Sequence, residues 1–237
     1  MVNMNKKIAI QLFGHLRTFK DTFLNFKKYL IDANKVLGYD FDIFIHTWNV
    51  LEFKKGEVGR FGMLDNSNIM GKLVSEDDKK FIIEKYNPIK LKIEEQTPDK
   101  TKRYTLDSVN KMRIDYQNQN SIDYKWILYT RPDILFVKPF VLDYFVLPYT
   151  NDEELRNIKK MPKDAMFCAS NLFARIPIAD PDCVTCWDLI WFNKPNDKIL
   201  RNKKIPVKYF LEKDFVILRS NNIDEFKLEN KKLFIQQ

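Results

Sequence analysis

The chain has 237 residues, 45% of them hydrophobic and 30% charged, so it is long enough to bury a large core as one globular domain. Its net charge of +8 comes from lysines scattered along the whole sequence without a zinc-finger, homeodomain or ribonucleoprotein motif, which predicts no specific nucleic-acid partner. Only three cysteines are present, which argues against a disulfide framework, and no apolar run reaches the roughly 18 residues that cross a bilayer.

The first part of the sequence predicts a strand, a helix and a second strand. Residues Lys7–Phe13 are apolar and rich in strand formers, and Gly14 ends the run. A helix is expected to follow Thr18, a candidate N-cap, because an apolar stripe continues at Phe19, Phe23, Phe26 and Leu30. The second strand is expected at Phe41–Trp48, followed by an irregular segment at 51–73.

The same alternation continues along the chain. A helix is predicted to begin at Ser75, where Asp78 three residues later completes a capping pattern. Residues Ile89–Glu94 alternate between polar and apolar, as an edge strand does, and a helix is expected over 106–119. Tyr124–Thr130 is the next strand. Strands that alternate with helices predict an α/β fold with a mainly parallel sheet.

The C-terminal part is less regular than the rest. It contains three apolar segments with strand-like composition: Ala165–Ala169, Asp188–Phe192 and Val207–Arg219. We found no internal repeat and no clear linker, so residues 1–237 are expected to form one domain. Its two halves are expected to be residues 1–140 and 141–237.

Polar residues follow three of the predicted strands directly. These clusters are Gly14-His15-Leu16-Arg17, His46-Thr47-Trp48-Asn49 and Arg131-Pro132-Asp133. Ligands of parallel α/β sheets bind beyond the carboxyl ends of the strands. The convergence of the three clusters at one sheet edge therefore predicts a binding site that includes Gly14, His15, Arg17, Thr47 and Trp48.

The Arg131-Pro132-Asp133 cluster is the most informative, because apolar runs flank it on both sides. Pro132 cannot donate to a strand ladder, so it interrupts the pairing. Arg131 offers a planar donor fork that suits phosphate, and Asp133 offers an oxygen ligand for Mg²⁺ or Mn²⁺, or an acceptor for sugar hydroxyls. The alternative is a mutual ion pair that closes a turn.

Several of the other candidates have a structural alternative. His15 suits a turn, His46 lies within an apolar strand, and Trp48 suits core packing as well as stacking on a ligand. Asn110 and Arg113 share one helix face, which is either a ligand-facing or a solvated face.

Candidate general bases lie in the C-terminal part, at Asp180, Asp182 and Asp188. Asp188 adjoins an apolar run, where burial would raise the pKa of a carboxylate toward a useful value. A helix-cap or turn role is the alternative for each of the three. Of these residues, Asp188 is predicted to be catalytic.

The chain resembles bacterial glycosyltransferases of the GT-A nucleotide-sugar type, in particular the small ones encoded with capsule and lipooligosaccharide genes. Three passages carry the resemblance: Ile8-Ala9-Ile10-Gln11-Leu12-Phe13-Gly14-His15-Leu16-Arg17-Thr18-Phe19, Phe41-Asp42-Ile43-Phe44-Ile45-His46-Thr47-Trp48 and Trp126-Ile127-Leu128-Tyr129-Thr130-Arg131-Pro132-Asp133-Ile134. The C-terminal part matches only loosely, through the segment that begins at Asp188.

The resemblance implies a GT-A-like, Rossmann-type nucleotide-binding half and an acceptor-side half. In this fold Asp-x-Asp usually holds a divalent cation on the donor diphosphate, whereas this chain has Arg131-Pro132-Asp133. Two interpretations follow from this departure. Either Asp133 holds Mn²⁺ or Mg²⁺ with help from water and diphosphate, or Arg131 neutralises the diphosphate and the enzyme is metal-independent.

The expected function is transfer of a sugar from a nucleotide-diphosphate donor to a hydroxyl of a surface glycan. The expected partners are the nucleotide sugar, a glycan or lipid-linked glycan acceptor, and an anionic membrane surface contacted peripherally. Because Lys6 and Lys7 lead directly into the first strand, no secretory leader is expected. The expected location is the cytoplasm, including the inner face of the cytoplasmic membrane.

Two other functions remain open at this point. One is transfer of a nucleotidyl or phosphoryl-linked group to a sugar, although the single glycine of the Gly14 loop is poor for a phosphate loop. The other is a nonenzymatic nucleic-acid-binding domain that uses the positive net charge.

Overall fold

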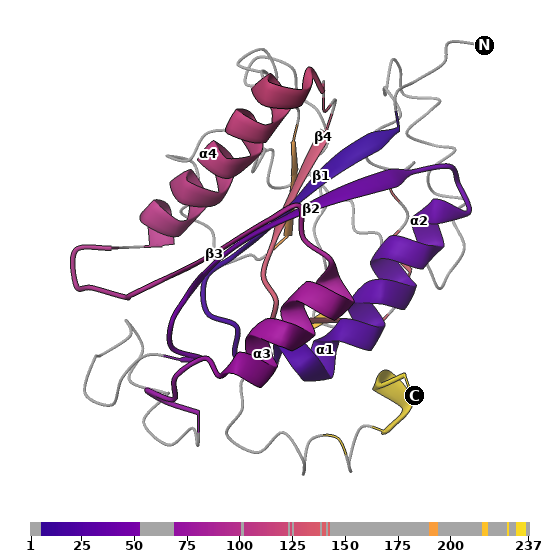
Figure 1. Ribbon diagram of the computed structural model, residues 1–237. Coiled ribbons are helices and arrows are strands. Elements are labelled where there is room, and N and C mark those ends of the chain that lie inside the picture. The colour runs from indigo at the N-terminus through magenta and orange to yellow at the C-terminus, as the bar shows by residue number, and fades with distance from the viewer. Residues whose placement is uncertain are drawn as a thin grey trace, which may run out of the picture.

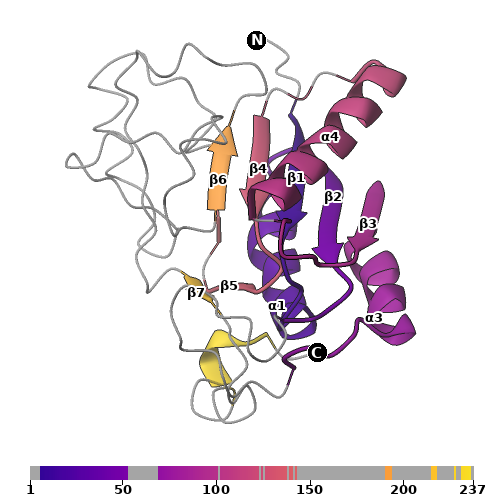
Figure 2. The ribbon, with the colours of Figure 1, turned by 90° about the vertical axis from the view of Figure 1, so that its left-hand side faces the viewer.

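A sheet of five strands forms the centre of the molecule (Figure 1). The computed structural model describes residues 6–52, 69–100, 102–122, 124, 126–137, 139–140, 142, 190–193, 215–217, 227 and 231–235. Across the sheet the order is β3-β2-β1-β4-β6 (Figure 2). These strands are β1 (Lys7–Phe13), β2 (Asp40–Trp48), β3 (Lys90–Glu94), β4 (Trp126–Thr130) and β6 (Ile190–Asn193).

The first four strands of this sheet are parallel, and β6 pairs antiparallel with β4. The α/β fold predicted from the alternating pattern is therefore confirmed as a Rossmann-like arrangement. The prediction of an edge strand at Ile89–Glu94 is also confirmed, because β3 is at one end of the sheet. Within β1, Ile8, Ile10 and Leu12 join the core cluster on one face, and the residues between them point to the other face.

Helical segments that precede and follow β2 in the sequence cover one face of the sheet, the face to which Ile8, Ile10 and Leu12 point (Figure 1). They are α1 (Phe19–Phe26), the π-helical η1 (Lys27–Asp32), α2 (Ala33–Lys35), α3 (Glu76–Phe81) and the π-helical η2 (Ile82–Tyr86). The predicted stripe of Phe19, Phe23, Phe26 and Leu30 is buried in this core. Apolar spacing predicted the buried face but not the change from α- to π-helical turns after Phe26.

Thr18 is the N-cap residue of α1, as predicted, although its side chain does not cap the helix with a hydrogen bond. Its backbone has φ −95° and ψ 27°, which differs from the extended conformation that a capping side chain requires. The carbonyl of Thr18 instead accepts hydrogen bonds from the backbone amides of Asp21 and Thr22.

The opposite face of the sheet is covered by one long helix, α4 (Lys102–Asn120). Leu106 and Val109 of this helix pack in a second core cluster with Ala9, Phe44 and Ile127. Because α4 runs from the end of β3 back to the start of β4, its first turns lie near the carboxyl edge of the sheet (Figure 2). No helix in the described part of the chain is long and apolar enough to cross a bilayer.

Beyond β4 the chain forms β5 (Ile134–Phe136), which pairs antiparallel with β7 (Phe215–Ile217). Buried amide side chains attach this segment to the first helical layer. Asn25 donates to the carbonyl of Phe136 at 2.7 Å, and Asn34 donates to the carbonyl of Phe140 at 2.6 Å. These bonds fix the segment that immediately follows Asp133.

Two of the three strand-like segments predicted in the C-terminal part contain or overlap strands of the structure. Strand β6 starts within the predicted Asp188–Phe192 segment and β7 lies within Val207–Arg219, while a short 3₁₀ turn, η5 (Lys231–Leu233), follows near the end of the chain. The predicted segment Ala165–Ala169 and the predicted catalytic residue Asp188 lie outside the described residues.

A capping box between Ser75 and Asp78 stabilises the start of α3. The Ser75 hydroxyl accepts from the Asp78 amide at 3.1 Å, and the Asp78 carboxylate accepts from the Ser75 amide at 2.9 Å. Replacing Ser75 with Ala should therefore lower the free energy of unfolding by about 1 kcal/mol, measured by urea denaturation. The control is Ser108→Ala, in the interior of α4, which should change it by less than about 0.5 kcal/mol. Equal effects of the two substitutions would contradict the capping role.

Candidate functional site

The candidate site lies at the point where the connections of the sheet change direction. Strand β1 has β2 on one side and β4 on the other; the connection from β1 to β2 includes α1 on one face of the sheet, whereas the connection from β3 to β4 is made by α4 on the opposite face. In open α/β sheets, ligands bind at such a switch point, beyond the carboxyl ends of the strands. The loops that follow β1 and β4 carry the predicted residues Arg17, Arg131 and Asp133.

The loop after β1 is turned by two left-handed residues. Gly14 has φ +94°, which a glycine adopts without steric cost, and Arg17 has φ +47°, which is uncommon for a residue with a Cβ atom. The backbone amide of Arg17 donates to the carbonyl of Leu51 at 3.0 Å. This backbone conformation accompanies an inward-pointing Arg17 side chain that is only 6% exposed.

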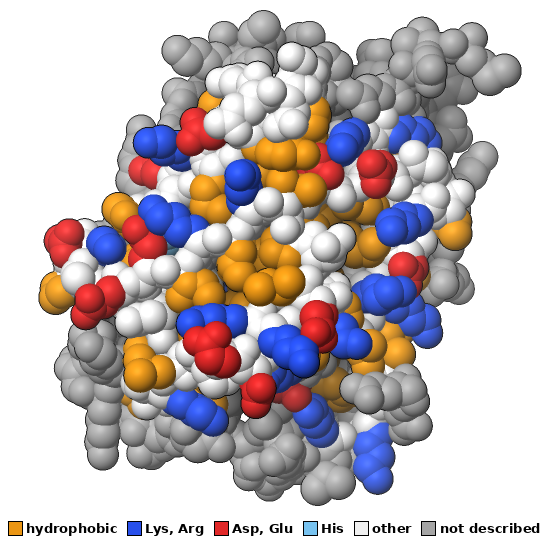
Figure 3. Space-filling view, viewed as in Figure 1, with side chains coloured by type: hydrophobic (Ala, Val, Ile, Leu, Met, Phe, Trp, Pro, Cys, Tyr) orange, Lys and Arg blue, Asp and Glu red, His pale blue; other side chains and the backbone are white. Residues whose placement is uncertain are grey.

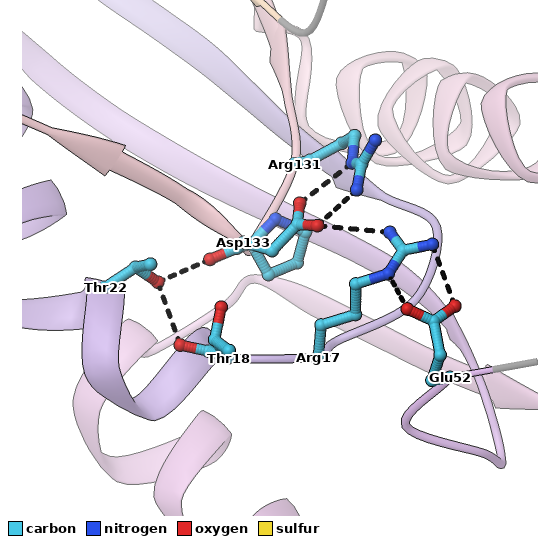
Figure 4. A network of polar contacts seen from close by, with 7 residues as sticks. Arg17, Thr18, Thr22, Glu52, Arg131 and Asp133 are labelled. Carbon is cyan, nitrogen blue, oxygen red and sulfur yellow. Dashed lines mark hydrogen bonds and ion pairs between the residues drawn. The ribbon is translucent and has the colours of Figure 1, made fainter. Parts of the chain in front are cut away.

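Four charged side chains form one network at this position (Figure 4). Arg17 binds the Glu52 carboxylate through Nε and through Nη2, the latter at 2.9 Å, and its Nη1 donates to Asp133 Oδ2 at 3.1 Å. Arg131 also binds Asp133, through Nε to Oδ1 at 2.8 Å and through Nη2 to Oδ2. Both oxygens of Asp133 therefore accept hydrogen bonds from guanidinium groups.

A helix residue fixes the turn between Arg131 and Asp133. The Thr22 hydroxyl, on α1, donates to the carbonyl of Pro132 at 2.5 Å (Figure 4). Pro132 has no amide proton, so it cannot donate to a strand ladder at this position. The hydrogen bond from Thr22 attaches the turn to α1 and helps to orient the side chains of Arg131 and Asp133.

Among the described residues, the network contains two guanidinium groups and two carboxylates, whose charges balance. Burial raises the pKa of Asp133, but the charges of Arg131 and Arg17 outweigh burial and hold the pKa below its usual value. Asp133 is 0% exposed, whereas the Arg131 side chain is 12% exposed and is the outermost of the four. Arg131 is therefore the member that a ligand at the sheet edge reaches first.

This arrangement does not fit the predicted metal role of Asp133. A divalent cation would have to displace guanidinium groups from both carboxylate oxygens and would lie next to two positive charges. The described residues also contain no group of three or more His, Cys, Asp or Glu side chains that could hold a metal ion. The alternative interpretation, a mutual Arg131–Asp133 ion pair at a turn, is present, and Arg17 extends it.

The predicted residues on β2 and in the first loop belong to an aromatic cluster. Trp48 is buried, with its ring stacked on Tyr104 at 6.1 Å and edge-on to His46 at 5.4 Å. His46 is 0% exposed and its Nε2 lies 2.6 Å from a Glu94 oxygen. His15 lies 2.9 Å from the Gln96 side-chain oxygen. His46 and Trp48 are therefore packed inside the protein, as the structural alternative for these residues predicted. Ligand contact at this cluster stays a prediction.

Thr47 points to the opposite face of the sheet from its neighbours His46 and Trp48. Strand alternation places it on the same face as Ile43 and Ile45, under the first helical layer. Its hydroxyl is buried and has no hydrogen-bond partner among the described residues. A donor-binding role for Thr47 stays a prediction.

Asn110 and Arg113 are adjacent, but Arg113 is buried, so the interpretation as a solvated face does not describe it. Arg113 is 3% exposed, and its Nη2 donates to Asn110 Oδ1 at 2.7 Å. Gln11 on β1 and Tyr129 on β4 each contact the same Asn110 oxygen at 3.4 Å. The helix face on which these residues lie therefore points toward β1 and β4.

Several residues of the site were missed in the sequence. Glu52 lies in a segment that had no periodicity, so nothing in the sequence indicated that it pairs with Arg17. Gln11 had a detectable signal, because it is a lone polar residue within the apolar strand β1. Glu94 is the last residue of β3 and Gln96 follows it, and the carboxyl end of this strand belongs to the same sheet edge.

No model of a known protein family matches this chain, and no curated protein matches it either. The chemistry of the site is therefore interpreted from its own geometry.

The ion-pair network predicts a large stability effect of Glu52. Replacing Glu52 with Gln removes one carboxylate and leaves Arg17 buried with a deficit of negative charge, so the free energy of unfolding should fall by about 3 kcal/mol. Urea denaturation measures this loss. The matched control is Glu76→Gln, whose side chain is 88% exposed and should contribute less than about 0.5 kcal/mol. A Glu52 effect as small as that of the control would contradict a buried network.

Because His15 is buried, we expect the free energy of unfolding to fall in acid. Burial, together with the charge of Arg17, lowers the pKa of His15 from 6.5 to about 4. The unfolded chain therefore takes up this proton first, so stability is complete above about pH 6.5 and falls as the pH decreases toward 4. His15→Gln removes the titration, and its unfolding free energy should fall less steeply across this range. Equal slopes for the variant and the wild type would refute the assignment.

Proposed function

We propose that this protein is a glycosyltransferase that moves a sugar from a nucleotide-diphosphate donor to a hydroxyl of a surface glycan. The observation that carries the proposal is the position of Arg131. It is the outermost cation of a pre-formed network at the switch point of a Rossmann-like sheet, where such sheets bind nucleotides. The resemblance of the three sequence passages to GT-A glycosyltransferases supports the same function.

In the proposed reaction, the acceptor hydroxyl oxygen forms a bond to the anomeric carbon of the donor sugar. The bond between that carbon and the diphosphate oxygen breaks, the diphosphate leaves with the bonding electrons, and the acceptor loses its proton to a base. Negative charge therefore grows on the diphosphate. A planar guanidinium that already lies at the site stabilises this charge without reorganisation.

The four-residue network would give Arg131 its fixed position. Its Nε and Nη2 groups both bind Asp133, which orients the plane of the guanidinium group. Arg17 and Glu52 would act behind it by holding Asp133 in place. In this proposal Arg17 is a positioning residue rather than a direct ligand of the nucleotide, because its side chain is buried and bonded to both carboxylates.

The proposal assigns neutralisation of the diphosphate to Arg131 instead of a metal ion. Its basis is that both oxygens of Asp133 accept from guanidinium groups. Asp188 as general base, the glycan or lipid-linked acceptor, and peripheral contact with an anionic membrane in the cytoplasm remain parts of the proposal that follow from the sequence.

The two alternative functions have less support. A nucleotidyl or phosphoryl transferase would need a loop of backbone amides around the phosphates, whereas the Gly14 loop turns its cation, Arg17, inward. A nucleic-acid-binding surface would gather positive charge in one stripe. On the face shown in Figure 3, Lys and Arg side chains are interspersed with Asp and Glu.

The proposal predicts that a nucleoside diphosphate binds without a divalent cation. We expect at least one member of a panel of nucleoside diphosphates to raise the melting temperature equally with EDTA and with Mn²⁺. Arg131→Gln should weaken binding at least about tenfold, since a charge-assisted fork to phosphate is lost.

The control for this measurement is Lys111→Gln, an exposed cation on α4, which should bind as the wild type does. Absence of stabilisation by every nucleoside diphosphate would refute the glycosyltransferase proposal. Stabilisation that requires Mn²⁺ would refute the metal-independent part alone and restore the metal role of Asp133.

A further inference from the structure

Arg113 is a buried cation whose described partners are all neutral. It is 3% exposed, and its guanidinium donates to Asn110 Oδ1 at 2.7 Å and to Gln117 Oε1 at 2.8 Å. Burial lowers the pKa of Arg113, and the interactions that oppose this effect come from Tyr129 and Tyr124, not from a carboxylate. A buried charge without a counter-ion is costly, in contrast to the balanced Arg17 network.

The hydrogen bonds around Arg113 are also incomplete among the described residues. Its Nε is buried without an acceptor, and Oε1 of the neighbouring Gln11 is buried without a donor. Asn110 Oδ1 receives three donors, two of them at the long distance of 3.4 Å. Buried polar groups are normally paired. A ligand that carries an oxyanion for Arg113 and a hydroxyl for Gln11 would complete both groups.

The cluster lies close to the surface and is continuous with the switch point. Asn110, Gln117 and Tyr129 are each partly exposed, so the Arg113 guanidinium is covered on its outer side by side chains that solvent contacts. Tyr129 precedes Arg131 by two residues on β4, and Gln11 is its register partner on β1. The cluster therefore lies on the α4 side of the same two strands whose ends carry the Arg131 network.

We propose that Gln11, Asn110, Arg113 and Tyr129 form a second oxyanion subsite that binds an acidic sugar. Within the described part of the chain, the Arg113 guanidinium has no counter-ion, and the nearby Gln11 amide oxygen has no donor. A ligand that carries an anionic group next to hydroxyl groups would suit both. The carboxylate of a sugar acid and the phosphate of a sugar phosphate both have this chemistry. The inference names the substrate class of the proposed transferase and rests on that function, but the subsite binds its probe independently of the nucleotide.

The test is a calorimetric titration of the full chain with glucuronate, with glucose 1-phosphate and with glucose. Glucuronate or glucose 1-phosphate should bind at least about tenfold more tightly than glucose, because only they supply an oxyanion. The tighter of the two identifies the anion as carboxylate or phosphate. Equal affinity for all three probes, or binding of none, would overturn the proposal.

An isosteric variant separates ligand binding from folding. Asn110→Asp places a carboxylate at the oxygen that is 2.7 Å from Arg113, so it should raise the melting temperature and weaken binding of the anionic probe at least about tenfold. Asn120→Asp, at the exposed end of α4, is the matched control and should bind the probe as the wild type does. Unchanged probe affinity in Asn110→Asp would overturn the assignment.

Failure of this inference can be distinguished from failure of the proposed function. The nucleoside diphosphate panel reports on Arg131 and the glucuronate titration reports on Arg113, each with wild-type protein. A response to diphosphates without a response to acidic sugars would leave the transferase in place and remove only the acidic substrate. The reverse result would leave an acidic-sugar-binding protein without the proposed transfer activity.

Discussion

The buried carboxylate of Asp133 is the constraint on which the rest of the site depends. A fully buried carboxylate is tolerated only with close positive partners, and here Arg131 and Arg17 both supply them. Two guanidinium groups around one carboxylate would leave an excess of positive charge, and Glu52 removes it. Because these four residues come from the ends of β1, β2 and β4, electrostatic balance connects three loops that are distant in sequence.

The helices of the first layer serve both packing and positioning. Phe19 and Phe23 of α1 fill the core, while Thr22 and Asn25 of the same helix are also buried and bind backbone carbonyls of the segment after β4. A buried hydroxyl or amide is costly unless it is paired, so each of these residues specifies one position of the opposing chain. Apolar burial holds the layer to the sheet, and the polar bonds fix the segment that carries Asp133.

Local patterns predicted most of the described fold and little of the pairing within the site. The apolar run of β1, the stripe of α1 and the capping pattern at Ser75 depend on neighbours within a few residues, so the sequence contains their signal. The contact between Arg17 and Asp133 joins residues 116 positions apart, and no local period reports it. The left-handed backbone of Arg17 was hidden for the same reason, since only the tertiary pairing compensates its steric cost.

The three arginines near the switch point differ in how completely the described residues neutralise them. Arg17 contacts two carboxylates and is buried, which suits a structural cation. Arg131 binds Asp133 and is the most exposed part of its network, which suits a cation that exchanges between protein and ligand oxygens. Arg113 contacts only amide oxygens although it is buried. Because an unbalanced buried charge is costly and a ligand can supply the missing anion, binding is expected where internal neutralisation is least complete.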